Sequence, residues 1–220
     1  MRGLKKINSV IEKKKEVIHS EIGKVRLFFE DEASFGRISE TNDCWCPDGI
    51  RPVIHRQKVR EYREIFGAVE PLTGNFVYMI EEKEEPIKRK VGRPRKGEVV
   101  EIVKPKPKEK GWKSRLMNNF LQLLSDSFPD DHIVVCLDRA SWHDSQYTIV
   151  PDNMTLIPIP AYTPEMNPIE QLWREIRTRG FHNKYFHSIK DVVTNLHSTI
   201  ADIPSEVIQS ITQRSWFMVK

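Results

Sequence analysis

Apolar positions fall into two kinds of pattern, short continuous runs and helical spacings, which predict strands and helices in a definite order. Short runs of strand length occupy residues 25–29, 133–137 and 154–159. Two further β-prone runs, residues 60–70 and 75–80, are joined by Pro-Leu-Thr-Gly, which suits a tight turn. These two runs therefore predict a hairpin near the start of the chain.

Helical spacing of apolar residues predicts the remaining elements. One amphipathic helix is expected within residues 1–24, and a second begins near Trp112 and stops before Pro129. The others are expected at residues 168–179 and 188–200, the last opening on a serine that suits an N-cap. A hairpin followed by alternating helices and strands predicts a mixed α/β sheet with helices on its faces.

Several classes of protein are excluded by simple features of the sequence. The longest apolar run, residues 133–137, has only five residues, whereas a membrane-spanning helix needs roughly 20. The basic N-terminal stretch lacks the apolar core of a signal peptide. Three cysteines cannot pair completely, so we expect reduced thiols and no disulfide framework. The sequence therefore predicts a cytoplasmic protein without a membrane partner.

The basic charge of the chain is concentrated in one segment. The chain has 35 Lys and Arg against 31 Asp and Glu, a formal net charge of +4. Residues 81–110 alone contain 11 basic and 7 acidic residues, so they account for the whole excess. This segment also has four prolines and few aliphatic residues, too little apolar surface to offset its chain entropy. We therefore predict a mobile basic insertion at about residues 81–111.

Three carboxylates occupy positions that could serve a metal ion. Asp31 and Asp138 each follow a predicted buried strand, although strands also end in Asp simply to begin a turn. Glu170 follows Asn167 and Pro168 in a pattern typical of a capping box, which is a purely structural explanation. The two roles of Glu170 are compatible, because the positive end of a helix dipole favours an ionised carboxylate. Magnesium prefers such oxygen ligands.

Neighbours of the first carboxylate are expected to point elsewhere. If the first strand continues past residue 29, then Glu30 and Glu32 lie on the opposite face from Asp31. Asp31 alone is then the expected ligand in this acidic run. Trp142 and Trp173 are expected to fill the core in preference to stacking on nucleic-acid bases.

Three short motifs stand in order along the chain, at residues 29–32 (FEDE), 137–143 (LDRASWH) and 160–173 (PAYTPEMNPIEQLW). The last is the most specific, because a proline-rich approach followed by Asn-Pro-Ile-Glu and a Trp three residues on is rarely met by chance. Together with the hairpin at residues 67–74, they resemble the DDE transposases of bacterial insertion sequences, in the mariner-related superfamily. The resemblance spans residues 25–200.

The resemblance implies an RNase H-like fold, with a mixed five-stranded sheet flanked by helices, over residues 25–220. Residues 1–24 would form a basic helix or linker ahead of it. The implied catalytic and metal-binding triad is Asp31, Asp138 and Glu170, with Mg²⁺ as the cofactor and Mn²⁺ as a substitute.

The activity that the resemblance implies is metal-dependent DNA strand cleavage and strand transfer at insertion-sequence ends. Water and then a DNA 3′-hydroxyl would be the nucleophiles. The implied partners are the element ends and the target DNA, with a homodimer in the DNA complex because two ends must be brought together.

The chain departs from the family pattern in three places. Arg139 stands where the family usually has Asn, and a bulky cation there could perturb metal affinity. Asp138 and Glu170 are 32 positions apart, slightly closer than usual. Family members normally carry helix-turn-helix domains ahead of the catalytic domain, whereas about 24 residues precede the first strand here. We therefore expect the catalytic part of a split or truncated transposase, with a separately encoded helix-turn-helix partner.

Two alternative functions stay open. The first, a catalytically inactive DNA-binding or assembly fragment of a split transposase, follows from Arg139 and the missing N-terminal domain. The second is a general RNase H-like nuclease. His143 also has two interpretations, an accessory role on DNA or at the metal site, or a plain surface histidine.

The basic insertion contains a segment, residues 88–97 (KRKVGRPRKG), that is similar to an AT-hook. A narrow A-tract minor groove attracts inserted Arg side chains, and flanking lysines add salt-sensitive phosphate contacts. A solvated charge run without a DNA contact is the alternative. The candidate DNA-binding residues are Lys88, Arg89, Lys90, Arg93, Arg95 and Lys96.

Overall fold

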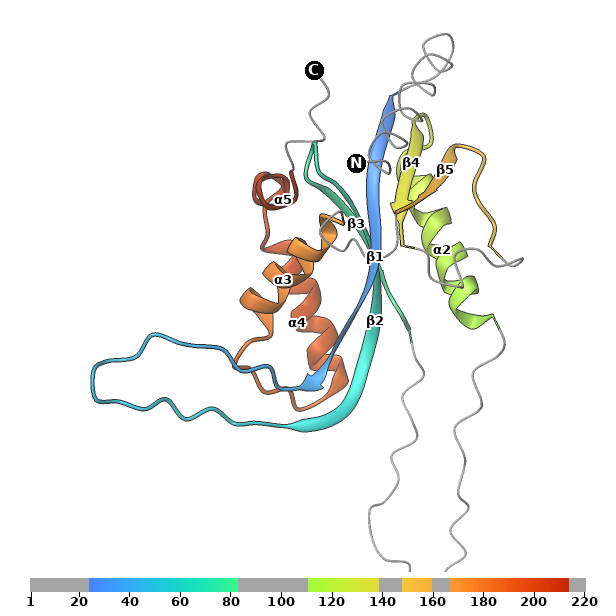
Figure 1. Cartoon of the computed structure of the whole chain (residues 1–220). Helices are drawn as coiled ribbons and strands as arrows, with labels where there is room; N and C mark the ends of the chain where they lie inside the picture. Colours follow the sequence, from blue (N-terminus) through green and yellow to red (C-terminus); the bar gives the residue numbers. More distant parts are fainter. Residues whose placement is uncertain (1–23, 83–110, 139–147, 160–166, 214–220) are drawn as a thin grey trace, which may run out of the picture.

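A five-stranded mixed sheet runs through the centre of the computed structural model, which describes residues 24–82, 111–138, 148–159 and 167–213 (Figure 1). Its strand order is β3-β2-β1-β4-β5. The strands are β1 (Val25–Ile38), β2 (Lys58–Glu70), β3 (Asn75–Ile80), β4 (His132–Leu137) and β5 (Met154–Pro158). β1 pairs antiparallel with β2 and parallel with β4, so it joins the hairpin half of the sheet to the parallel half.

Helices cover both faces of this sheet (Figure 1). They are α2 (Trp112–Ser127), α3 (Ile169–Gly180), α4 (Ile189–Ala201) and α5 (Ser205–Thr212). α3, α4 and α5 lie on one side and α2 on the other. The predicted mixed sheet with helices on its faces is confirmed.

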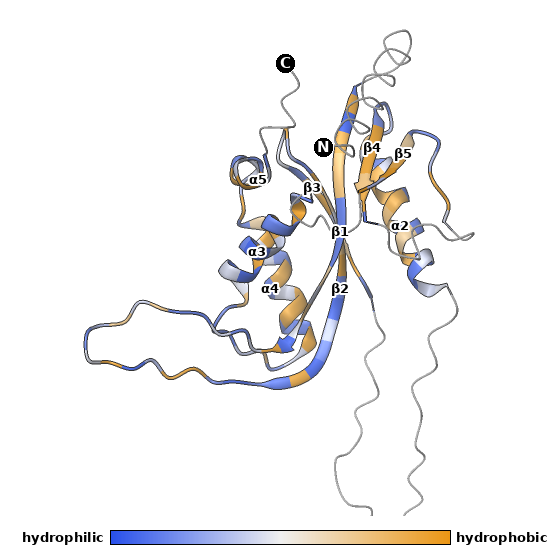
Figure 2. Cartoon of the chain, viewed as in Figure 1, coloured by the Kyte–Doolittle hydropathy of each residue, from blue (hydrophilic) through white to orange (hydrophobic). Residues whose placement is uncertain are grey.

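Alternation along β1 divides the apolar residues into two cores. Phe29 and Phe35 belong to the core under α3 and α4, whereas Phe28 belongs to the core under α2. Successive residues of a strand point to opposite faces, so each core takes every second residue. Figure 2 shows the apolar residues gathered on β4 and β5, which the two cores enclose.

Most predicted elements are confirmed to within two residues at the described ends, but the end of the first strand is wrong. β1 continues to Ile38, well past the acidic run, because Ala33 and Phe35 continue the alternation and pack into the core. α5 was not predicted. The helix expected within residues 1–24 and most of the insertion expected at about residues 81–111 lie outside the described residues.

The predicted hairpin and the predicted cap of α4 are both confirmed. Gly74 has a φ of 75° in the turn between β2 and β3, and an added Cβ would lie 2.0 Å from the Ser205 carbonyl oxygen. Only glycine fits this position without strain. Ser188 Oγ accepts a hydrogen bond from the Asp191 N–H at 3.1 Å, and the Asp191 carboxylate accepts one from the Ser188 N–H at 2.9 Å.

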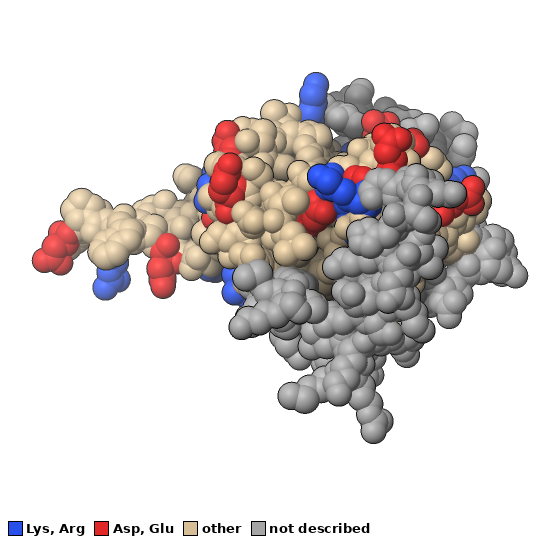
Figure 3. All heavy atoms as spheres, turned by 90° about the horizontal axis from the view of Figure 1, so that it is seen from above, with Lys and Arg blue, Asp and Glu red and all other residues tan. Residues whose placement is uncertain are grey.

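A long excursion between β1 and β2, residues 39–57, projects from the body of the molecule (Figures 1 and 3). We call this excursion the arm. Its base is closed by a hydrogen bond from the Ser39 N–H to the Gln57 carbonyl at 3.1 Å, and Asn42 exchanges hydrogen bonds with Asn183. Trp45 near its tip is fully exposed. In the part of the chain that the structure describes, no helix is long and apolar enough to cross a membrane.

A charged cluster ties the beginning of β1 to its two neighbours. Arg26 donates to Asp131, ahead of β4, at 2.5 Å, and to Glu70, at the end of β2, at 2.7 Å. The Lys24 N–H donates to the other Asp131 oxygen at 2.8 Å. These bonds hold the pKa of Asp131 below its ordinary value. The hydrogen bond from the backbone N–H of Lys24 has the largest effect, and Arg26 contributes next.

We expect Asp131→Asn to destabilise the fold near neutral pH by about 1.5–3 kcal/mol, a typical contribution of hydrogen bonds to a charged group. The folded-state pKa of Asp131 lies below the unfolded value of about 3.9. The stabilisation is therefore fully present above that value and is lost as the pH falls through the folded-state pKa. Urea unfolding at a series of pH values measures the effect, with the exposed neighbour variant Asp130→Asn as the control. A difference that persists at the acid end would contradict this account.

Candidate active site

Asp31 lies in the middle of β1 and faces α3. It stands opposite Gly67 of β2, and its Oδ2 accepts a hydrogen bond from the indole Nε1–H of Trp173 at 3.1 Å. Glu30 stands opposite Ala68, a member of the core under α2, so the predicted opposite orientation of Asp31 and Glu30 is confirmed. Alternation along an unbroken strand thus separates the two acids.

Trp173 can reach Asp31 because β2 has a glycine at the facing position. A Cβ added to Gly67 would lie 2.6 Å from Trp173 Cη2 and 2.8 Å from Phe76 Cε2. The indole is 1% exposed and packs edge-on against Phe76, so the predicted packing role of Trp173 is confirmed. Its hydrogen bond to Asp31 was missed. The available signal was the spacing of Trp173 three residues after Glu170, which places both residues on one side of a helix.

Glu170 lies exposed in the first turn of α3. The predicted capping box around it is wrong, because Pro168 is the N-cap and no side-chain hydrogen bond caps the helix. The Asn167 side chain instead donates to the carbonyl oxygen of Glu30 at 3.0 Å. This bond fastens the beginning of α3 to β1 next to Asp31. Asn167 therefore positions Glu170 by connecting two elements.

The carboxylates of Asp31 and Glu170 are close enough to repel each other. The pKa of Asp31 is raised from 3.8 to about 7, first by burial and then by the charges of Glu170 and Glu32. The hydrogen bond from Trp173 acts in the opposite direction. Two members of the predicted triad, 139 positions apart in the sequence, are thus brought together by the fold.

Asp138 directly follows β4 and is exposed. β4 runs parallel to β1 with Cys136 beside Phe29, so the strand register brings Asp138 to the same level of the sheet as Asp31. Its charge acts on Glu30, which is fully buried. Burial first, and then the charges of Glu32, Asp31 and Asp138, raise the pKa of Glu30 well above its ordinary value.

Glu30 is a feature of the site that the sequence did not predict. Both of its carboxylate oxygens are buried and have no hydrogen-bond partner among the described residues. A buried polar group without a partner costs stability. Burial of the Glu30 carboxyl without a partner therefore lowers the stability of the fold.

The acidic residues fit a hard divalent cation by their chemistry. Carboxylate oxygens are the ligands that Mg²⁺ and Mn²⁺ accept, and a cation would relieve the repulsion that raises the pKa of Asp31. In the described ranges, no three His, Cys, Asp or Glu side chains are gathered into one metal-holding group. The structure brings Asp31 together with Glu170, and Asp138 together with Glu30.

The remaining predicted site residues lie outside the described residues. Arg139, Trp142 and His143 belong to the stretch after β4. The candidate DNA-binding residues of the basic insertion are also outside it, namely Lys88, Arg89, Lys90, Arg93, Arg95 and Lys96. Their roles stay predictions.

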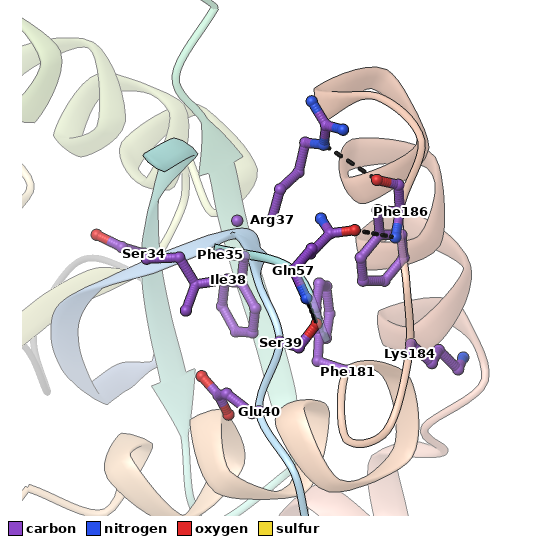
Figure 4. Close-up of a pocket in the computed structure, with 11 residues that line it drawn as sticks. Ser34, Phe35, Arg37, Ile38, Ser39, Glu40, Gln57, Phe181, Lys184 and Phe186 are labelled. Atoms are coloured by element: carbon purple, nitrogen blue, oxygen red, sulfur yellow. Dashed lines mark hydrogen bonds between the residues drawn. The ribbon is translucent and has the colours of Figure 1, made fainter. Parts of the chain in front are cut away.

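A pocket at the base of the arm is separate from these acids (Figure 4). It is lined by the far end of β1, by Gln57 and by the connection between α3 and α4, including Phe181 and Phe186. None of the predicted catalytic residues contributes to it.

Comparison with known proteins agrees with the observed sheet. Residues 101–193, which include Asp138 and Glu170, match the family model described as DDE superfamily endonuclease. The uncharacterized protein y4pE/y4sA of Sinorhizobium fredii (strain NBRC 101917 / NGR234) is 33% identical over 127 residues, which are 56% of this chain and 90% of that protein. The chain belongs to one family with this protein, and it carries a DDE superfamily endonuclease domain.

Solved structures of a transposase share the fold. The crystal structure of the catalytic domain of Mos1 mariner transposase aligns with a TM-score of 0.51 and 13% identity, covering 96% of this chain and 87% of that one. The Mos1 paired-end complex with the left transposon end aligns at 0.58 and 15%, and a pre-cleavage Mos1 transpososome at 0.60 and 14%. This chain spans only 56% of the length of those two. The RNase H-like fold predicted by the sequence motifs is confirmed.

We expect Glu170→Gln to lower the pKa of Asp31 below about 7, because the variant removes one of the two carboxylates that repel it. The pKa should remain above the ordinary value, since burial is the larger cause. Titration of the Asp31 carboxyl carbon by NMR measures the shift. Glu175→Gln, five residues further along α3, is the control and should leave the pKa of Asp31 unchanged. An Asp31 that titrates identically with and without Glu170 would show that the two side chains are not neighbours.

Gly67→Ala should destabilise the fold by about 1–3 kcal/mol, because the new methyl group overlaps the Trp173 ring in a packed core. Adding Trp173→Phe removes the overlapping ring atoms. The double variant should then lose less stability than the sum of the single variants, by a coupling free energy of about 0.5–3 kcal/mol. Chemical unfolding of all four proteins gives this coupling. Strict additivity would show that the indole does not lie over Gly67.

Proposed function

We propose that this chain is the catalytic domain of a transposase, which cleaves DNA strands at the ends of a bacterial insertion sequence and transfers them to target DNA. The observation that carries the proposal is the meeting of Asp31 and Glu170 on an RNase H-like sheet, with Asp138 at the end of the adjacent parallel strand. A structural role alone does not explain why Asp31 and Glu170 are held close enough to repel each other.

Asp31, Asp138 and Glu170 would hold the divalent ion, Mg²⁺ or Mn²⁺. When bound, such an ion supplies Lewis-acid stabilisation of the reacting phosphate and lowers the pKa of water. The other residues position these ligands. Trp173 fixes the orientation of the Asp31 carboxylate with its N–H, and Asn167 fastens the first turn of α3, and so Glu170, to β1.

The structural neighbours support DNA and a divalent ion as partners of this chain. Mos1 transposase has been crystallised as paired-end complexes with Mn and with Mg, and as a strand transfer complex. By analogy, the DNA ligands of this chain are the element ends and the target site. Two ends must be brought together for transfer, so we propose that two copies of the chain act in the DNA complex.

The test is strand cleavage of a labelled duplex that carries an element end, with and without Mg²⁺. Asp138→Asn should lower the cleavage rate by about 10³-fold, because metal-ion catalysis is worth several kcal/mol and each 1.4 kcal/mol is a tenfold change in rate. Binding of the duplex should survive the substitution, since one carboxylate contributes nothing to phosphate attraction.

Asp152→Asn is the matched control, because Asp152 is an exposed aspartate in the turn before β5. It should cleave as the parent does. Binding without any cleavage in the parent would favour the inactive assembly fragment instead. Cleavage of duplexes without element ends at an equal rate would favour a general nuclease.

A further inference from the structure

Basic side chains alternate with inward-facing ones where the arm returns to β2. Arg56, Lys58 and Arg60 are exposed, whereas Gln57 is buried and Val59 is half-buried. Extended chain places every second residue on the same side. The three cations therefore line one exposed side of the chain, and we call them the basic strand face.

Gln57 fixes this orientation from within the pocket at the base of the arm (Figure 4). Its side-chain oxygen accepts a hydrogen bond from the Phe186 N–H at 3.2 Å. Its N–H donates to Ser39 Oγ at 3.0 Å, and its carbonyl accepts from the Ser39 N–H at 3.1 Å. Because Gln57 is held inward on both its side chain and its backbone, Arg56 and Lys58 on either side are held outward.

The basic strand face has no acidic partner among the described residues. Arg56 donates to the Thr41 hydroxyl at 2.9 Å, which is a neutral acceptor. The side chains of Lys58 and Arg60 form no hydrogen bond or ion pair within the described ranges. Three positive charges are thus presented to solvent without compensation.

The acids nearest in sequence are engaged elsewhere. Glu61 pairs with Arg37 at 2.7 Å, and Glu64 faces Lys113 at 3.8 Å. Arg37 also donates to the Phe186 carbonyl at 3.0 Å, so it is held on the pocket side (Figure 4). Glu61 and Glu64 are therefore already paired, and the three cations of the basic strand face can contact a ligand.

We propose that the basic strand face binds the sugar–phosphate backbone of duplex DNA, as a contact surface separate from the acidic site. Every second residue of a strand is roughly 7 Å apart, so the three cations span about 14 Å, or about four base pairs at 3.4 Å of axial rise. The three cations can therefore lie along several phosphates of one DNA strand. This inference rests on the proposed function, since it assumes that DNA is the ligand.

The strand register gives the distance of this surface from the acids. Arg60 is seven residues from Gly67, which stands opposite Asp31. Seven residues span at most about 23 Å of strand, or roughly seven base pairs of duplex. Figure 1 shows β2 curving over this stretch, so the true separation is shorter. Because an odd number of residues separates them, Arg60 faces the α2 side of the sheet whereas Gly67 and Asp31 face α3, so the basic strand face meets DNA on the other face of the sheet from Asp31.

The test measures the salt dependence of binding to a labelled duplex of about 20 base pairs, without divalent ions, between about 50 and 200 mM salt. The triple variant Arg56→Ala/Lys58→Ala/Arg60→Ala should lower the slope of log K against log salt by about 2.7, since each lost phosphate contact removes about 0.9. Lys58→Arg keeps the charge and should keep the slope. Thermal melting confirms that each variant is folded.

The matched control is Arg179→Ala/Lys184→Ala/Lys190→Ala, which removes the same charge from α3, α4 and the connection between them. Its slope should change by less than about 0.5. Equal changes in both triple variants would overturn the proposal, because only overall charge would then matter. A parent that is dimeric without DNA and a triple variant that is monomeric would also overturn it, since the surface would then bind a second copy.

This experiment separates the inference from the function on which it rests. If the parent cleaves with Mg²⁺ but the triple variant has an unchanged slope, the proposal for the basic strand face is rejected and the proposed transposase activity stands. If the parent never cleaves but the triple variant shows the expected loss of slope, the DNA-binding surface stands and the proposed transposase activity is rejected.

Discussion

The hydrogen bond from Trp173 to Asp31 is the interaction on which the site depends. It spans three elements, because the indole of α3 crosses Gly67 of β2 to reach an acid on β1. A second bond, from Asn167 to the Glu30 carbonyl, fastens the beginning of the same helix to the same strand. Because α3 is held to β1 at two points, Glu170 in its first turn is held near Asp31. The position of the helix is therefore coupled to the acidity of the site.

Strand alternation is the second constraint, and it acts on both members of the antiparallel pair β1 and β2. On β1 it places Asp31 toward α3 and buries Glu30 on the other side. At the beginning of β2 it buries Gln57 and exposes its basic neighbours. One geometric rule thus separates groups that are adjacent in sequence into chemically different surfaces. One sheet thus carries both the acids around Asp31 and the basic strand face. This combination suits a protein that binds a polyanion such as DNA and also binds a metal cation next to it.

Much of the fold followed from local patterns, because burial of apolar residues fixes the strands and the helical faces. The end of β1 could not be found this way, since an acidic run interrupts apolar residues whose alternation resumes at Ala33. The capping box at Asn167 failed for a different reason: its side chain makes a tertiary hydrogen bond that no local pattern encodes. The triad members could be named from the motifs, but the contact of Asp31 with Trp173 depends on Gly67, which lies far away in sequence.

The central claim is that Asp31 and Glu170 belong to one cation site. Titration of Mn²⁺ into the isotopically labelled chain tests it directly, because the paramagnetic ion broadens NMR signals of nearby residues. The account predicts early broadening around Asp31 and at the beginning of α3, with loss of both effects in Asp31→Asn. Broadening confined to other acids, such as those of the arm, or early broadening at α3 that survives Asp31→Asn, would contradict it.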